Sequence, residues 1–503
     1  MKVEILDTTL RDGEQTSGVT FTSPEKLSIL RLLIEELNVD RVEIASAKVS
    51  EGEHDAVKKM AQWAIKNGYI DRLEVLGFVD GNVSLKWIQE AGCRVVNLLC
   101  KGSLKHCREQ LRKTPEEHIA GIKKVILLAQ QMNVTVNIYL EDWSNGMIHS
   151  PEYVYFMVDE LKNYPIKRFM LPDTLGILNP INTSEFCGRM KERYPDLQFD
   201  FHAHNDYDLA VGNVFAAVSS GITGIHATIN GLGERAGNVP LASVVAILHD
   251  QLKFKTNINE NNLNMVSRIV ESYSGIRVPN NKPIIGDSVF TQCAGIHADG
   301  DNKNNLYCND LLPERFGRSR EYALGKTSGK SNIKKNLEAL GIELDEESMR
   351  RVTERIIDLG DKKEMVTQED LPYIIADVLR NENTDRIKIL NYSLSLTQGL
   401  RPTAAVKMEI DGQIYEQTAP GDGQYHAFSK ALWKIYNEIG KPKPTLTDYN
   451  VNIPSGGRTD ALVQTTISWN FNGRDFKTRG LDVDQTSAAI KATVKMLNLI
   501  ENM

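Results

Sequence analysis

The sequence predicts an α/β fold: a (β/α)8 (TIM) barrel, followed by small linker subdomains and a C-terminal α+β domain with an internal repeat. Three observations predict it. Short β-branched runs alternate with helical patterns through the first half of the chain, polar residues follow the ends of these runs, and a strand–helix pattern recurs near the C-terminus. Alternating strands and helices indicate parallel strands joined by right-handed crossovers. A doubly wound open sheet is the competing architecture.

Eight apolar runs are predicted as the strands of the barrel, and they span residues 3–7, 41–45, 73–78, 95–99, 136–141, 168–173, 199–204 and 225–230. Helical patterns lie between them. The first of these helices is expected to begin at Ser23 as its cap, with Pro24 in its first turn. Eight such units in about 250 residues match the number and size of a closed barrel.

Polar and ionisable residues collect where the predicted strands end. T-L-R-D-G-E-Q follows the first strand, Y-L-E-D-W-S-N-G the fifth and L-P-D-T-L-G the sixth, while the seventh ends in H-A-H-N-D and the eighth runs into N-G-L-G-E-R-A-G-N. The carboxyl ends of barrel strands lie together on one face, where such folds carry their sites. The sequence therefore predicts a functional site on this face.

The seventh strand places two imidazoles on one side, because side chains alternate along a strand. His202 and His204 share that side, and Asp12 from the first loop gives a set of two histidines and one carboxylate. Such a set suits a divalent ion and leaves coordination positions open, to which a 2-oxo acid can chelate. Asn238 is a plausible neighbour of the ion. The alternatives are a structural histidine pair and a simple salt bridge between Asp12 and Arg11.

The glycine-rich segment G-L-G-E-R-A-G, residues 231–237, is interpreted as a tight turn that lets the backbone approach this site. A dinucleotide-binding loop is disfavoured. The third glycine comes one place too late for G-x-G-x-x-G, and the segment follows the last strand instead of opening the first unit.

Composition excludes several classes of function. The chain of 503 residues has a net charge of −7, which argues against a nucleic-acid partner. No apolar run approaches the roughly 20 residues of a membrane span, and no signal peptide precedes the first strand. The six cysteines form no C-x-x-C pair. We therefore expect no membrane association, reduced thiols and a cytoplasmic location.

Four parts are expected: a barrel over 1–265, a linker subdomain over 266–330, a helical subdomain over 331–385 and a C-terminal domain over 386–503. Within the second part, residues 295–307 are rich in Asn, Asp and Gly and predict a loop. The last part repeats itself with a shift of 61 positions. The pairs are Gly412 and Gly473, Gln424 and Gln485, Ala427 and Ala488, Lys430 and Lys491, Lys434 and Lys495, and Asn437 and Asn498.

The motifs T-L-R-D-G-E-Q, H-A-H-N-D and N-G-L-G-E-R-A-G-N together resemble those of a known family. Its members are the metal-dependent barrel enzymes that condense acetyl-CoA with 2-oxo acids: 2-isopropylmalate, homocitrate and citramalate synthases. The similarity is strong over residues 1–330 and weaker beyond. V-E-I-A-S-A, V-L-G-F-V-D-G-N, N-L-L-C-K-G-S and Y-L-E-D-W-S-N-G look most like citramalate synthase.

The resemblance implies a Claisen condensation. A divalent ion (Mn, Mg, Zn or Co) on Asp12, His202 and His204, with Asn238 beside it, would hold pyruvate. Arg11 would stabilise the oxyanion that develops on the keto oxygen. The family pattern also implies a catalytic role for Glu141.

Substrate choice follows from the same resemblance. Thr174 would lie near the carboxylate of the 2-oxo acid, and Leu76, Leu99 and Tyr139 would face its side chain. Large side chains there favour pyruvate over 2-oxoisovalerate, so citramalate synthesis is favoured and 2-isopropylmalate synthesis is the alternative. Ordinary barrel core is the other interpretation of the two leucines.

The resemblance also assigns the segment after the barrel. His297 and Tyr307 would assist proton transfer or hydrolysis, Asp299 would contact substrate, and Asn305 and Leu306 would line the acetyl-CoA side, all over the active site of the partner in a homodimer. The family uses the C-terminal domain for dimer contact and amino-acid feedback, and isoleucine is the logical effector of citramalate synthesis. The loop 454–461 is either an effector site or a plain hairpin connection. A lyase or aldolase, and an amino-acid-binding protein with a relic barrel, are the remaining alternatives.

Overall fold

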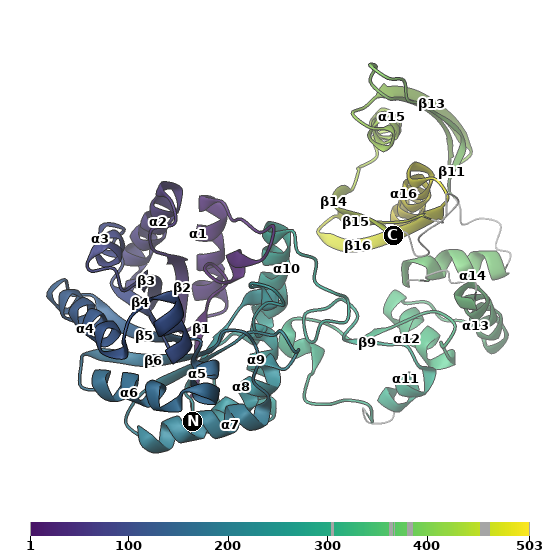
Figure 1. Ribbon diagram of the computed structural model, residues 1–503. Helices are drawn as coiled ribbons and strands as arrows, with labels where there is room; N and C mark the ends of the chain where they lie inside the picture. Colours follow the sequence, from purple (N-terminus) through teal and green to yellow (C-terminus); the bar gives the residue numbers. More distant parts are fainter. Residues whose placement is uncertain are drawn as a thin grey trace. The chain divides into compact units, whose positions relative to one another are not determined.

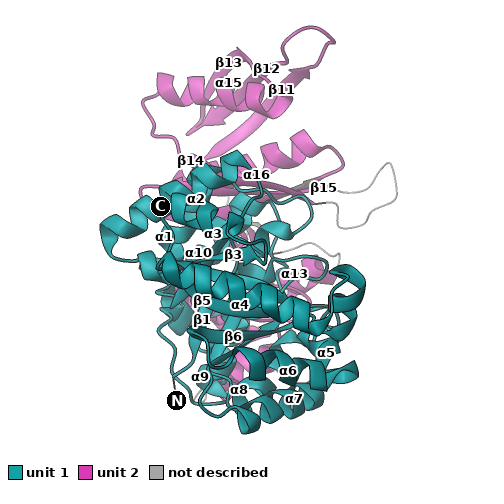
Figure 2. Ribbon diagram, turned by 60° about the vertical axis from the view of Figure 1, so that its left-hand side comes forward, with its two compact units in different colours: residues 1–290, 308–320 teal, residues 291–307, 321–503 magenta. Residues whose placement is uncertain are grey.

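The computed structural model describes residues 2–302, 306–361, 366, 368–379, 386–452 and 463–501. The chain forms two compact units, coloured teal and magenta in Figure 2. Unit 1 comprises residues 1–290 and 308–320, and unit 2 comprises residues 291–307 and 321–503. Each unit is described below by itself.

Unit 1 is a closed barrel of eight parallel strands, which confirms the predicted fold and rules out the open sheet (Figure 1). The barrel closes because β1 pairs with β8. Its strands are β1 (Glu4–Asp7), β2 (Arg41–Ser46), β3 (Leu73–Phe78), β4 (Val95–Lys101), β5 (Thr135–Glu141), β6 (Ile166–Asp173), β7 (Phe199–Ala203) and β8 (Gly224–Ala227).

Helices surround this barrel in Figure 1. They are α1 (Ser23–Arg31), α2 (Glu51–Asn67), α3 (Val83–Glu90), α4 (Pro115–Gln131), α5 (Trp143–His149), α6 (Pro151–Leu161), α7 (Pro180–Arg193), α8 (Ala210–Ser219), α9 (Leu241–Asp250) and α10 (Leu263–Ser274). The cap of α1 is Thr22, one residue before the predicted Ser23, because Thr22 and Glu25 form a capping box. Pro24 lies in the first turn as predicted.

The barrel holds two kinds of core. A large apolar core packs between the outer faces of the strands and the helices. Inside the barrel a smaller apolar cluster is formed by Leu6, Leu76, Leu99, Tyr139 and Met170. Ionic residues fill the interior near the amino ends of the strands, where Arg41 and Arg168 both bind Asp200 and also pair with Glu74 and Glu4.

The eighth strand is shorter than predicted. It ends at Ala227, because Ile229–Gly231 forms a 3-10 turn in which Asn230 has a φ of 60°. The glycine-rich segment continues this turn as expected, with φ values of 76° at Gly231 and 85° at Gly237. A side chain at Gly233 would overlap the Asn238 amide, so glycine is required for the backbone to pass so close.

The first part of unit 2 contains β9 (Thr291–Gln292), which pairs with β10 (Glu321–Tyr322), and the helices α11 (Gly295–Asn302), α12 (Lys330–Leu340), α13 (Glu346–Asp361) and α14 (Leu371–Leu379). The prediction of a loop over 295–307 is wrong for residues 295–302, which form α11. Tertiary packing overrides the composition, because Ala298 is buried and α11 contacts α12. The helices predicted for the helical subdomain are confirmed. Among the described residues, no helix combines the length and apolar character that a bilayer crossing needs.

The C-terminal part of unit 2 confirms the internal repeat. One copy comprises β11 (Ile387–Ser395), β12 (Thr403–Ile410), β13 (Gln413–Pro420) and α15 (Gln424–Glu438). The other comprises β14 (Thr445–Asn452), β15 (Val463–Phe471), β16 (Arg474–Asp482) and α16 (Gln485–Glu501). The paired glycines Gly412 and Gly473 occupy matching hairpin turns, with φ values of 82° and 81°. The two copies share one apolar core.

Candidate metal and substrate site

The sequence-predicted triad converges at the carboxyl end of the barrel. His202 extends from β7, His204 directly follows it, and Asp12 lies in the turn after β1, where its N–H donates to the carbonyl of Thr8. The Asp12 Oδ2 atom lies 3.1 Å from His202 Nε2 and 3.8 Å from His204 Nε2. All three side chains are buried, and one ligand-type atom from each lies within 4.8 Å of the other two.

The protonation states of the triad suit metal ligation. Burial lowers the pKa of His202, and burial is also the main cause that lowers the pKa of His204 to about 4, so both imidazoles are neutral near pH 7. Burial acts to raise the pKa of Asp12, but Arg11 and the two imidazoles outweigh it and hold the pKa well below its usual range. A neutral imidazole and an ionised carboxylate are the forms that bind cations.

A divalent cation fits the donor set that these residues present. Among the described residues, Asn238 Oδ1 is a buried polar atom without a hydrogen-bond partner. Asn238 pairs with His204 through an isolated β-bridge, and its Nδ2 donates to the carbonyl of Leu232 over 3.1 Å, so that Oδ1 is the free atom. A buried oxygen without a partner is costly, and a cation bound at the triad would satisfy Asn238 Oδ1.

Arg11 lies beside the triad and is held by a residue that the sequence analysis missed. Its Nε donates to Glu43 Oε2 over 2.6 Å, and its Nη1 lies 3.5 Å from Asp12 Oδ2. The alternative of a salt bridge between Arg11 and Asp12 therefore holds together with the triad and does not replace it. Alternation along R-V-E-I-A was the available signal, because it places Glu43 on the same strand face as Arg41, which also points into the barrel.

The three residues expected to contact the 2-oxo acid side chain lie together. Leu76, Leu99 and Tyr139 belong to the apolar cluster inside the barrel. The Tyr139 ring lies 5.8 Å from the His202 ring and 5.9 Å from the Arg11 guanidinium carbon, so the cluster adjoins the triad. Burial raises the pKa of Tyr139 well above its usual value, which keeps the phenol neutral.

Glu141 is the last residue of β5, and Thr174 directly follows β6. The Thr174 hydroxyl oxygen accepts the backbone N–H of Asp142 over 2.9 Å, so its own proton remains available to an anion. Glu141 forms an ion pair with Lys101, a buried lysine at the end of β4. The sequence analysis assigned no role to Lys101.

The comparisons with known proteins agree with this geometry. The HMGL-like family model matches residues 2–270, a homocitrate synthase post-HMGL domain-like model matches 284–364, and a LeuA allosteric (dimerisation) domain model matches 365–501. The chain is 32% identical to the (R)-citramalate synthase CimA of Methanocaldococcus jannaschii, over 100% of both chains. It is 34% identical to the putative (R)-citramalate synthase CimA of Methanopyrus kandleri, over 93% of this chain and 90% of the relative. The 2-isopropylmalate synthase of M. jannaschii is 32% identical, over 99% of this chain and 95% of the relative.

The chain belongs to the citramalate and 2-isopropylmalate synthase family. The whole length of the chain is covered by these relatives, so the membership includes the C-terminal domain. The resemblance on the sequence motifs is therefore confirmed.

The linker residues of this synthase lie in unit 2. The ring of His297 on α11 contacts the ring of Tyr307 in a tilted arrangement, at a centroid distance of 4.3 Å. Leu306 and Tyr307 are exposed, and Asp299 lies on α11 within the same segment. Asn305 lies outside the described residues, as does the loop 454–461. Unit 2 therefore carries an aromatic pair of its own, His297 and Tyr307.

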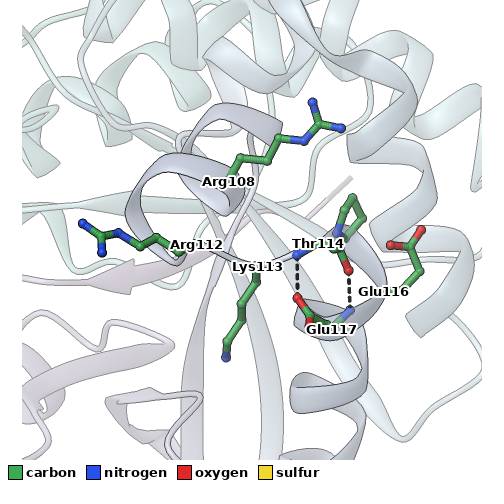
Figure 3. Close-up of a pocket in the computed structure, with 7 residues that line it drawn as sticks. Arg108, Arg112, Lys113, Thr114, Glu116 and Glu117 are labelled. Atoms are coloured by element: carbon green, nitrogen blue, oxygen red, sulfur yellow. Dashed lines mark hydrogen bonds between the residues drawn. The ribbon is translucent and has the colours of Figure 1, made fainter.

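A shallow pocket lies in the loop between β4 and α4 of the synthase barrel (Figure 3). Its wall includes Arg108, Arg112 and Lys113, all exposed cations. The dashed lines in Figure 3 mark the capping box of Thr114 and Glu117, which already uses the first N–H groups of α4. None of the residues around the triad lines this pocket, so the chemistry belongs to the buried site.

Proposed function

We propose that this protein catalyses the metal-dependent condensation of acetyl-CoA with pyruvate to (R)-citramalate, as an acyltransferase of isoleucine biosynthesis. The observation that carries the proposal is the triad of Asp12, His202 and His204, which lies beside Arg11 and adjoins the apolar cluster inside the barrel. Two relatives of this chain carry the name (R)-citramalate synthase.

Asp12, His202, His204 and Asn238 would hold the ion, which is Mn, Mg, Zn or Co. When bound, it would supply a Lewis acid that polarises the keto group and fixes the 2-oxo acid in place. The unpartnered Asn238 Oδ1 and the neutral imidazoles support this assignment.

Arg11 would stabilise the negative charge that develops on the keto oxygen as the new C–C bond forms. Its guanidinium is nearly buried and pre-oriented by Glu43, and such a fixed cation stabilises charge far better than a mobile one in water. Thr174 would donate its free proton to the substrate carboxylate, since its oxygen already accepts from the Asp142 N–H. Glu141 would act as a catalytic carboxylate.

Pyruvate is favoured because Leu76, Leu99 and Tyr139 fill the space next to the triad. Their large side chains leave room for a methyl group and crowd an isopropyl group. The alternative, 2-oxoisovalerate as in leucine biosynthesis, is supported by the similarity to 2-isopropylmalate synthases.

A homodimer would complete the acetyl-CoA side. Asn305 and Leu306 would line it, and Asp299 would contact substrate. His297 and Tyr307, whose rings are in contact, would assist proton transfer or thioester hydrolysis. Each would lie over the active site of the partner subunit. The LeuA dimerisation model that matches 365–501 supports the dimer and an amino-acid effector, for which isoleucine is the candidate.

The test is thiol release from acetyl-CoA with pyruvate, 2-oxoisovalerate or 2-oxoglutarate. We expect turnover with pyruvate, a higher kcat/KM for pyruvate than for the other two acids, loss of turnover with a chelator, and recovery when a divalent ion is returned. Thiol release with none of the three acids would refute the condensation. A preference for 2-oxoisovalerate would replace citramalate with 2-isopropylmalate as the product.

A further inference from the structure

The interior of the barrel contains a row of hydrogen-bonded polar side chains that the proposed chemistry does not use. Asn137 Nδ2 donates to Asn97 Oδ1 over 2.8 Å, and Asn97 Nδ2 donates to Glu43 Oε1 over 2.8 Å. Glu43 Oε2 then accepts Arg11 Nε over 2.6 Å. These four residues, called the relay below, connect β5 and β4 to β2 and the loop after β1.

The relay has one arrangement of donors and acceptors. Glu43 is a fully buried carboxylate that can only accept, so the Asn97 amide must turn its N–H toward Glu43 and its carbonyl toward Asn137. Each Glu43 oxygen then receives one donor, Asn97 on one side and Arg11 on the other. The rotation of the Glu43 carboxylate is fixed from both sides.

A pair of fully buried amide side chains is unusual for the interior of a barrel, which is mostly filled by branched apolar residues. Asn97 and Asn137 are both 0% exposed, next to an interior cluster of leucine, methionine and tyrosine. Asn137 Oδ1 has no partner within the described part of the chain, so the pair carries a desolvation cost that two leucines would avoid. Polar residues retained at such a cost are expected at functional sites.

We propose that Asn97, supported by Asn137, is a positioning residue that orients Arg11 through Glu43. The inference rests on the proposed function, in which Arg11 stabilises the charge on the keto oxygen. Glu43 binds the Nε–H of Arg11, so the two Nη groups of the guanidinium remain available to contact Asp12 and the substrate. Nη1 already lies beside Asp12. Without the Asn97 donor, Glu43 Oε1 is buried and unpaired, and the carboxylate turns and carries the guanidinium with it.

The experiment compares Asn97→Leu with Asn213→Ala in the full-length metal-loaded enzyme. Asn213 is an equally buried asparagine on α8, which donates to the carbonyl of Leu178. We expect Asn97→Leu to lower kcat about 100-fold, as displacement of a catalytic group by about 1 Å does, with the KM for pyruvate changed less than about threefold. Asn137→Leu, which leaves the bond from Asn97 to Glu43 in place, should have a smaller effect. Asn213→Ala should keep kcat near that of the wild type.

A double-mutant cycle separates orientation from general destabilisation. Arg11→Lys keeps a cation but has no planar fork to orient, so Asn97→Leu should lower kcat less than about threefold in that background. The proposal would be overturned if Asn97→Leu lowered kcat by the same factor in the wild-type and the Arg11→Lys backgrounds. It would also be overturned if Asn213→Ala lowered kcat as much as Asn97→Leu does. If Asn97→Leu does not fold, Asn97→Ala and Asn137→Leu take its place in the same cycle.

A crystal structure of the variant gives a readout that does not depend on turnover. The contact between Arg11 Nε and Glu43 should be broken in Asn97→Leu and intact in Asn213→Ala. An inactive wild type would refute the proposed function. The relay would then be tested only by whether the contact between Arg11 Nε and Glu43 is broken in Asn97→Leu. An intact contact in Asn97→Leu would refute the relay even if the wild type condenses acetyl-CoA with pyruvate.

Discussion

Lys101 and Glu141 are register partners on β4 and β5, and their side chains form an ion pair at the carboxyl end of the barrel. The position of Lys101 is fixed from two directions. Its backbone N–H donates to His118 Nε2 over 3.1 Å, and its carbonyl accepts the Tyr153 hydroxyl over 3.1 Å. The carboxylate proposed as catalytic is therefore paired with a lysine whose backbone is held at both its N–H and its carbonyl.

Lys101→Met should lower kcat about 10- to 100-fold. The variant leaves Glu141 without its counter-ion in a partly buried site, where an uncompensated charge is costly and rearranges. Steady-state thiol release measures the effect, and calorimetric titration with Mn²⁺ should show unchanged metal affinity. Lys105→Met, at an exposed lysine four residues further along the chain, is the control. Activity within twofold of the wild type in Lys101→Met would show that the ion pair is only structural.

His202→Ala should abolish turnover while the protein stays folded. It removes one of three ligands, and the remaining pair cannot hold the ion in a fixed geometry. His226→Gln is the matched control: its ring lies 5.4 Å from that of His202, but its Nε2 faces Asp200 and not the triad. Bound metal, measured after gel filtration, should disappear only in His202→Ala. Full metal content in His202→Ala would show that His202 is not a metal ligand.

Leu76→Ala and Leu99→Ala should shift preference toward bulkier 2-oxo acids. Each truncation opens a volume beside Tyr139 in the cluster that adjoins the triad. Each methylene of new space changes the discrimination between two 2-oxo acids by about 1–3 kcal/mol, and each truncation opens space for one to three methylenes. The kcat/KM for 2-oxoisovalerate, divided by that for pyruvate, should therefore rise at least tenfold. An unchanged ratio would show that Leu76 and Leu99 are ordinary barrel core and do not select the substrate. Leu6→Ala, in the same cluster, reports the cost of a cavity alone.

The sequence predicted the parts of this molecule that rest on periodicity. Strands with β-branched runs, the two histidines at the end of β7 and the 61-residue repeat all follow from local spacing, and the structure has each of them. The helix α11 was missed, because its Asp, Asn and Gly content predicts a loop and only its packing against α12 makes it helical.

The supporting residues of the site could not be found from local spacing. Glu43, Asn97 and Lys101 lie on β2 and β4, far from Arg11 and Glu141 in sequence, and each acts through a contact across the barrel. Alternation places them on the inner face but does not say which side chains meet there. Such contacts depend on the register and closure of the barrel, and these are properties of the tertiary structure.

Acid should destabilise the barrel through His118. Burial, helped by the charges of Lys113 and Lys101, lowers the pKa of this imidazole to about 4, against about 6.5 in an unfolded chain. Between these values the unfolded state binds more protons, so stability is complete above pH 6.5 and falls as the pH drops toward 4. The full loss is at most about 3 kcal/mol, from a shift of 2.5 pKa units.

His118→Gln tests this linkage, because an amide oxygen can accept the Lys101 N–H and does not titrate. Urea unfolding at pH 7 should give similar midpoints for variant and wild type, and at pH 4.5 the variant should be the more stable of the two. His149→Gln, at an exposed histidine of α5, should follow the wild type at both pH values. A difference between His118→Gln and wild type that stays constant from pH 7 to pH 4.5 would mean that His118 does not bind its proton in that range, since only a group whose protonation differs between folded and unfolded states changes stability with pH.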